Sequence, residues 1–345
     1  MKFVVLIAVG WVIALVQAGV GAASLAWVGT GEVPGDRILH YEAAAGEAND
    51  GVIVDHEDGG FEITDGGATI AVGSGCTSLA PHRVRCNLDD DDTIDVMLGD
   101  GNDLVSVDVF SVGVRRVQGG RGDDRIRGSR TEFGLDRLWG GRGDDSLFGR
   151  EGTDVLDGGP GADDLSGGTS CDTGLDGACF TAIDTVTYAG RTRRVHADAD
   201  NDTHDDGSGF VAGDSDEGDT IFADVERLVG GSNRDVLGGT TTNLSFAPIS
   251  AAHEDPVPFL VGMWLEGRKG NDVLRGGRAP DLIIGGRGDD VLRGRLGRDR
   301  LRGGRGNDRL FARDGRRDRV NGGPARDEAR IDTGLDRVRR VEKIL

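Results

Sequence analysis

Aromatic residues are scarce in this chain: Phe, Trp and Tyr together make up 5% of its 345 residues. Bulky rings therefore cannot build its core. The sequence also lacks any long amphipathic helical pattern, and its 60 Gly residues argue against a helical bundle, because glycine destabilises a helix interior. Collagen is excluded as well, since these glycines have no strict three-residue period.

Known catalytic motifs are missing too. No H-E-x-x-H zinc motif and no G-x-S-x-G nucleophile motif occurs, and the six histidines are scattered. Paired carboxylates such as Asp144 and Asp145 could form a glycosidase centre, but they recur with a repeat, so ion binding accounts for them better. The sequence therefore predicts a protein that is not an enzyme.

The N-terminal region is typical of an exported protein. An uncharged run from residue 3 to residue 31 is aliphatic until about Val16, and small residues then take over. This order predicts a signal peptide over residues 1–23, cleaved after Ala18 or Ala23, although the run is also long enough for an uncleaved anchor. We expect a secreted, extracellular protein with no membrane span after cleavage.

Four cysteines agree with an oxidising compartment. They form two close pairs, Cys76 with Cys86 and Cys171 with Cys179, and neither pair has the spacing of metal ligands. The sequence therefore predicts two local disulfides.

The net charge of −20 is unevenly distributed. Residues 266–345 contain 22 Lys and Arg against 14 Asp and Glu, a net charge of +8, so the rest carries −28. The acidic part repels itself unless cations neutralise it, whereas the basic part could attract polyanions. The arginine excess could equally be compositional, because Arg outnumbers Lys by 37 to 3.

A nine-residue repeat is the strongest signal in the chain. Residues 140–166 read GGRGDDSLF, GREGTDVLD and GGPGADDLS, and a second array covers residues 267–310. The sixth position is Asp in eleven copies, and the residue two positions later is always apolar. The aspartates are Asp103, Asp124, Asp145, Asp154, Asp163, Asp235, Asp272, Asp281, Asp290, Asp299 and Asp308.

Calcium chemistry explains this spacing. Ca²⁺ takes six to eight oxygens, of which one Asp supplies one or two, and glycine-rich turns can direct backbone carbonyls at the ion. The three residues after each Asp can form a short strand whose middle side chain points to the opposite face from its neighbours. Two units then make one flat coil, stacked coils bring aspartates of successive turns to one ion, and the apolar residues form an internal ladder.

These residues resemble the G-G-x-G-x-D-x-U-x repeat of the RTX (hemolysin-type) calcium-binding proteins, over about half the chain. The resemblance implies an all-β fold, a parallel β-roll or β-helix solenoid with a small N-terminal β element. It also implies that the eleven aspartates are side-chain ligands of Ca²⁺ and that carbonyls of the glycine turns complete each site.

Some positions depart from the repeat. Arg295 and Ala325 replace glycines, and residues 313–320 lose the phase, which predicts a worn terminal coil or cap. The first three aspartates are 21 residues apart, which we interpret as nine plus twelve. The intervening turns, which end in Arg115 and Asp136, lack the double glycine, so weaker sites are expected there.

The pattern divides the chain into five segments. They are the signal peptide 1–23, a small β domain with a local disulfide over 24–90, an array with an irregular acidic coil over 91–239, an inserted loop over 240–265, and a second array with a cap over 266–345. The acidic loop at 198–206 is either an extra calcium site or a solvated loop. The loop does not match an EF-hand, because Thr203 and Gly209 occupy its Gly and Glu positions.

The sequence predicts a secreted calcium-binding protein whose folding is coupled to Ca²⁺. Two alternatives stay open. One is an adhesin that binds an anionic cell-surface polymer, but not nucleic acid, through Arg287, Arg293, Arg305 and Arg309. The other is a remnant of a secreted hydrolase or polysaccharide-modifying enzyme.

Overall fold

The structure, a computed structural model, is all-β: its described part holds 31 strands and no helix. It describes residues 23–30, 36–44, 46, 48–55, 60–88, 92–110, 114–131, 134–169, 183–199, 207–208, 218–222, 224–239 and 262–345. Almost all of the expected signal peptide, the pair Cys171 and Cys179, most of the acidic loop and most of the inserted loop lie outside these residues. None of the described residues forms a helix able to cross a membrane.

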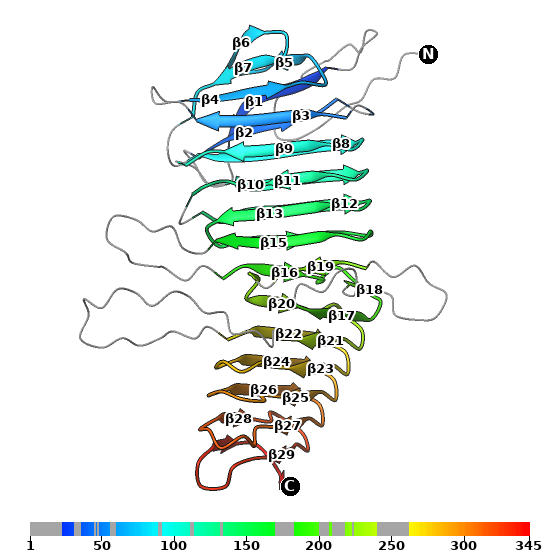
Figure 1. Cartoon of the computed structure of the whole chain (residues 1–345), viewed down its shortest axis with the longest axis vertical. Helices are drawn as coiled ribbons and strands as arrows, with labels where there is room; N and C mark the ends of the chain where they lie inside the picture. The colour runs from blue at the N-terminus through cyan, green and yellow to red at the C-terminus, as the bar shows by residue number, and fades with distance from the viewer. Residues whose placement is uncertain are drawn as a thin grey trace, which may run out of the picture.

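Three sheets form the solenoid, which runs as a column of strands from the N-terminal to the C-terminal end (Figure 1). We call them the long, the N-terminal and the C-terminal sheet. In spatial order, the long sheet consists of β30 (Arg337–Arg339), β28 (Arg319–Asn321), β26 (Arg300–Arg305), β24 (Leu282–Arg287), β22 (Trp264–Lys269), β20 (Arg227–Val229), β16 (Thr185–Thr187), β14 (Val155–Asp157), β12 (Arg137–Arg142), β10 (Val114–Arg121), β8 (Thr93–Asp100), β2 (Arg37–Glu42), β1 (Ser24–Thr30) and β5 (Ile70–Val72).

The two shorter sheets supply the second strand of each coil. The N-terminal sheet consists of β19 (Thr220–Ile221), β15 (Asp164–Thr169), β13 (Ser146–Glu151), β11 (Arg125–Arg127), β9 (Leu104–Asp108), β3 (Asp50–Asp55), β4 (Phe61–Asp65), β7 (Arg83–Cys86) and β6 (Cys76–Ala80). The C-terminal sheet consists of β18 (Gly207–Ser208), β17 (Val195–Asp198), β21 (Val236–Gly238), β23 (Val273–Arg275), β25 (Val291–Arg293), β27 (Arg309–Phe311), β29 (Glu328–Arg330) and β31 (Lys343–Ile344).

The N-terminal β element caps the column and continues it. Most of its strands pair antiparallel with each other, as β1 with β2 and β3 with β4, although β1 pairs parallel with β5. Strands β2 and β3 pair parallel with β8 and β9 of the first coils. The predicted disulfide between Cys76 and Cys86 is confirmed and joins β6 to β7.

Two nine-residue units make one coil, as the repeat predicts. Leu138 pairs with Leu156 in the long sheet, and Leu147 pairs with Leu165 in the N-terminal sheet, in both cases 18 residues apart. The apolar residues that follow the eleven aspartates are at most 2% exposed and belong to one core between the sheets. Burying each such side chain contributes about 1.5–3 kcal/mol, so this ladder is the principal apolar stabilisation of each coil.

Coils of irregular length keep the same register. Ile126 pairs with Leu147 across 21 residues and Leu310 with Ala329 across 19, so the extra residues lie in turns. The stretch 313–320 loses the phase in the sequence, yet Val320 still pairs with Leu301. The segment 240–261 lies between β21 and β22, which both pair with their neighbours in the regular stacks.

Candidate metal centre

All eleven predicted aspartates are buried at the ends of turns, where they immediately precede or begin the inward-facing strands. None is more than 3% exposed. In each regular coil, one carboxylate oxygen accepts a hydrogen bond from the backbone N–H of the acidic residue one coil earlier. Asp145 Oδ1 accepts from the N–H of Asp124 at 2.8 Å, and Asp163 Oδ1 accepts from the N–H of Asp145 at 2.9 Å.

These hydrogen bonds link the acidic residues into four ladders at the points where turns enter the sheets: one ladder precedes strands of the N-terminal sheet, one precedes strands of the C-terminal sheet, and two precede successive parts of the long sheet. The ladders are Asp103, Asp124, Asp145, Asp163 and Asp219; Asp136, Asp154, Asp184 and Glu226; Asp235, Asp272, Asp290, Asp308, Asp327 and Glu342; and Asp281, Asp299, Asp318 and Asp336. The structure therefore distributes the eleven predicted residues over four stacks rather than one cluster.

Eight further ladder residues are not among the eleven aspartates that the nine-residue pattern predicts. They are Asp136, Asp184, Asp219, Glu226, Asp318, Asp327, Asp336 and Glu342. Each lies two positions before an apolar residue, as Asp136 does before the buried Leu138. An acid-x-apolar search without the double glycine would have found them.

The second carboxylate oxygen of many ladder residues is buried and accepts no hydrogen bond from the described chain. This holds for Asp103, Asp124, Asp145, Asp154, Asp272, Asp290, Asp299 and Asp308. By contrast, Oδ2 of Asp235 and of Asp281 accepts a backbone N–H from Gly231 or Gly277. A buried carboxylate oxygen without a donor is costly, so these eight atoms favour either a bound cation or a proton.

Burial raises the pKa values of these groups. Desolvation is the largest cause for Asp145, with a further contribution from the neighbouring carboxylates, and raises its pKa to about 7. The pKa of Asp272 rises to about 8, and that of Asp154 to about 9, for the same leading reason. Nearby carboxylates add to the increase in each ladder, which a bound cation would relieve.

Glycine carbonyls face the same buried oxygens. A Cβ on Gly140 would lie 2.2 Å from Oδ2 of Asp145 and 2.4 Å from the carbonyl oxygen of Gly158 in the next coil. A Cβ on Gly303 would likewise lie 2.2 Å from Oδ2 of Asp308. The first glycine of the repeat is therefore required because a carboxylate and a carbonyl oxygen converge over its Cα.

This donor set fits calcium. It offers only hard oxygen ligands, from one carboxylate and from turn carbonyls, as Ca²⁺ prefers. No group of three or more His, Cys, Asp or Glu side chains able to hold a metal occurs among the described residues. A cation would therefore be held mainly by the carbonyls of the glycine turns, with Oδ2 of the ladder aspartates as the charged ligands. The individual ligand roles of the eleven aspartates stay predictions.

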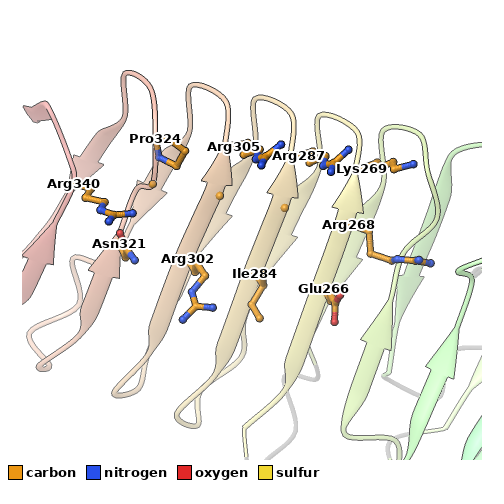
Figure 2. A pocket seen from close by; sticks show the side chains of 13 residues that line it. Glu266, Arg268, Lys269, Ile284, Arg287, Arg302, Arg305, Asn321, Pro324 and Arg340 are labelled. Atoms are coloured by element: carbon orange, nitrogen blue, oxygen red, sulfur yellow. The ribbon is translucent and has the colours of Figure 1, made fainter.

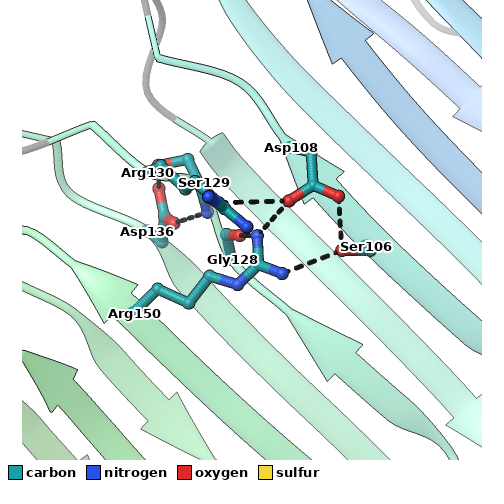
Figure 3. A network of polar contacts seen from close by, with 7 residues as sticks. All are labelled: Ser106, Asp108, Gly128, Ser129, Arg130, Asp136 and Arg150. Carbon is teal, nitrogen blue, oxygen red and sulfur yellow. Dashed lines mark hydrogen bonds and ion pairs between the residues drawn. The ribbon is translucent and has the colours of Figure 1, made fainter.

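Near the N-terminal end, arginines pair with carboxylates outside the ladders, among them the half-buried Asp108 (Figure 3). Arg150 donates to Oδ1 of Asp108 at 2.6 Å, to the Gly128 carbonyl at 3.2 Å and to Oγ of Ser106 at 3.1 Å. Burial acts to raise the pKa of Asp108, but the hydrogen bond and charge of Arg150 hold it below its usual range. Arg116 contacts Asp95 in the same way, through two hydrogen bonds of 2.7 Å.

The comparison with family models identifies the repeat. The model for the RTX calcium-binding nonapeptide repeat matches four segments, 116–130, 132–168, 266–301 and 293–328, about a third of the chain. These segments contain nine of the eleven predicted aspartates; Asp103 and Asp235 lie outside. Repeats of this kind bind Ca²⁺ as a structural ion, so calcium binding by the β-roll follows. The comparison with curated proteins found no match.

Proposed function

We propose that this chain, which carries RTX calcium-binding nonapeptide repeats, is an exported, non-enzymatic β-roll whose folding is coupled to Ca²⁺. One observation carries the proposal: the buried Oδ2 atoms of eight ladder aspartates accept no hydrogen bond from the described residues, and glycine carbonyls lie beside them. Several rows of such atoms inside one column repel each other, and divalent cations remove that repulsion.

The energetics support coupled folding. Each coil buries one apolar residue per sheet, while each ladder carboxylate must lose its hydration. Without a cation, the cost of dehydrating the carboxylates offsets much of the free energy gained by burying the apolar residues. Calcium binds the folded coil and has no preformed site in the unfolded chain, so its binding free energy becomes folding free energy.

Export is supported by the cysteines and by the N-terminal sequence. The Cys76–Cys86 disulfide is the kind of bond that persists in oxidising compartments, and residues 1–23 have the order of a secretory signal. Because calcium is scarce inside cells and plentiful outside, the roll would fold after export.

The test is a calcium titration of the mature chain followed by far-UV circular dichroism, with magnesium in parallel. We expect β signal to grow with calcium alone, because Mg²⁺ demands a stricter octahedral geometry and retains its water. A full β spectrum in chelator, unchanged by calcium, would overturn the coupling.

A matched pair of variants tests the ligands. Asp145→Asn removes one buried ladder carboxylate, whereas Asp144→Asn removes the exposed neighbouring charge. We expect Asp145→Asn to raise the calcium midpoint on the order of tenfold, as loss of a metal-site interaction does, and Asp144→Asn to change it little. Equal calcium midpoints for the two variants would show that the ladder carboxylates are not ligands of calcium.

A further inference from the structure

A shallow groove of ≈ 720 Å³ lies on the outer face of the long sheet in the second array (Figure 2). It runs over β22, β24, β26 and β28, on the side opposite to the buried Leu265, Ile283 and Leu301. Its charged lining consists of one carboxylate, Glu266, and of the six cations Arg268, Lys269, Arg287, Arg302, Arg305 and Arg340. The groove therefore carries a net charge of +5 on a chain whose net charge is −20.

The cations form a row because the strands are in register. Lys269 pairs with Arg287, and Arg287 with Arg305, so successive coils present one cation each at the same height. Adjacent strands are about 4.8 Å apart, and like charges directly opposite each other destabilise a sheet. Figure 2 shows these three side chains along one line near the ends of their strands.

The structure gives this row no counter-charge. Among the described residues, no carboxylate forms an ion pair with Lys269, Arg287 or Arg305, nor with Arg302 or Arg340. Glu266, the single acid of the groove, is already paired with Arg227 at 2.8 Å.

The aspartate ladders do not explain the row either. Those carboxylates are buried inside the coils, whereas Arg287, Arg302 and Arg305 are exposed on the outer face. On the C-terminal sheet, by contrast, Arg293 lies over the ring of Phe311 at 5.0 Å, and Lys343 pairs with Glu328 at 2.9 Å. The groove is thus an array of cations to which the described chain offers no carboxylate partner.

We propose that this groove binds an anionic polysaccharide that lies along the solenoid axis. Guanidinium groups bind carboxylate, sulfate or phosphate groups through paired hydrogen bonds. A linear polymer with an anion on each sugar matches a row with one cation per coil, because the length of one sugar unit is similar to the spacing between adjacent coils. The groove has no aromatic lining on which bases could stack, which favours a polysaccharide over single-stranded nucleic acid.

The geometry corrects the set of four arginines expected from the sequence. Arg287 and Arg305 line the groove in β24 and β26, but Arg293 and Arg309 lie in β25 and β27 of the C-terminal sheet. The four residues therefore do not form one binding face. The pair outside the groove becomes a matched control, with the same loss of charge in the same coils.

The experiment measures binding of the mature chain to dextran sulfate at saturating calcium, with neutral dextran and single-stranded DNA as further probes. We expect the Arg287→Ser/Arg305→Ser variant to bind dextran sulfate at least tenfold more weakly. Its salt dependence should fall by about two charges, by analogy with phosphate contacts. The Arg293→Ser/Arg309→Ser variant should bind nearly as well as the unchanged protein.

Equal losses in the two variants would reduce the effect to general charge attraction and overturn the site. Binding of DNA that is as tight as binding of dextran sulfate, and lost in the same variant, would assign the groove to nucleic acid instead. The proposal rests on folded coils, so circular dichroism of each variant is recorded at saturating calcium. A roll that is folded without calcium would defeat the coupled folding but leave this binding test intact.

Discussion

Calcium-free protein should become more stable as the pH falls from 8 to 5, the reverse of ordinary acid denaturation. Burial raises the pKa of Asp145 to about 7 and that of Asp272 to about 8. A carboxyl group whose pKa is higher in the folded chain binds extra protons on folding. Its contribution to stability is therefore fully present below the unfolded pKa and is lost as the pH rises through the folded pKa. The loss should occur between about pH 4 and about pH 8.

The loss of folding free energy per ladder carboxylate can be worked out for Asp145. For Asp145, the rise in pKa from 3.8 to about 7 corresponds to about 4 kcal/mol, at about 1.4 kcal/mol per pKa unit. This is the folding free energy that ionisation of one ladder carboxylate removes when no cation is bound. Calcium should invert the pH dependence, because it competes with protons for the same oxygen atoms.

The assay is circular dichroism at pH 5 and pH 8, with and without calcium, which measures the folded fraction and, where a thermal transition is present, the Tm. Acid also relieves the general repulsion of a chain with a net charge of −20, so variants are needed to isolate the ladder. At pH 8 without calcium, Asp145→Asn should be more stable than the unchanged chain; with calcium it should be less stable. Asp144→Asn should follow the unchanged chain in both conditions. If Asp145→Asn gains nothing without calcium at pH 8, the reasoning about the buried carboxylates is refuted.

Three further substitutions, two of them with a matched control variant, test other parts of the roll by urea unfolding of the calcium-loaded chain. Gly140→Ala should cost about 1–3 kcal/mol, because its Cβ meets a carboxylate oxygen at 2.2 Å. Gly190→Ala, which meets nothing within 4 Å, should be neutral, and equal losses would contradict the converging oxygens. Leu292→Ala, which truncates a buried residue of the apolar ladder, should lower the free energy of unfolding by about 2–5 kcal/mol. Leu296→Ala, whose side chain is 49% exposed, should change the free energy of unfolding by no more than about 0.5 kcal/mol. A larger loss for Leu296→Ala than for Leu292→Ala would show that the apolar ladder is not the core. Arg150→Ala should cost about 1–3 kcal/mol, because it removes the hydrogen bonds to Asp108, to the Gly128 carbonyl and to Ser106, and it should not shift the calcium midpoint; a shift would make this arginine part of the ion site.

Much of the fold follows from the repeat itself. The position of the apolar residue relative to the acid fixes which side chains enter the core, and the spacing of 18 residues fixes the coil. The sequence therefore predicts the buried places of Asp145 and Leu147 correctly, as well as the stacking of two units per coil.

The remaining ladder members are harder to predict because turn length varies without disturbing strand register. Asp136 and Asp318 enter the ladders through coils whose turns depart from the nine-residue pattern. The distribution of arginines over two faces has a similar cause. Successive units lie in opposite sheets, so only residues two units apart, such as Arg287 and Arg305, share a face.

Within each ladder, the hydrogen bonds between successive coils all run in the same direction. In each pair, the later coil supplies the carboxylate and the earlier coil supplies the N–H, as Asp145 does for Asp124. Within each ladder, the N–H of one coil is therefore paired only when the next coil is in place. The turn residue just before it pairs in the opposite sense, since Asp144 donates its N–H to Oδ1 of Asp123. Because each ladder N–H is paired by a carboxylate of the following coil, a column that grows from its N-terminal cap keeps an unpaired N–H at its growing end until the next turn has formed.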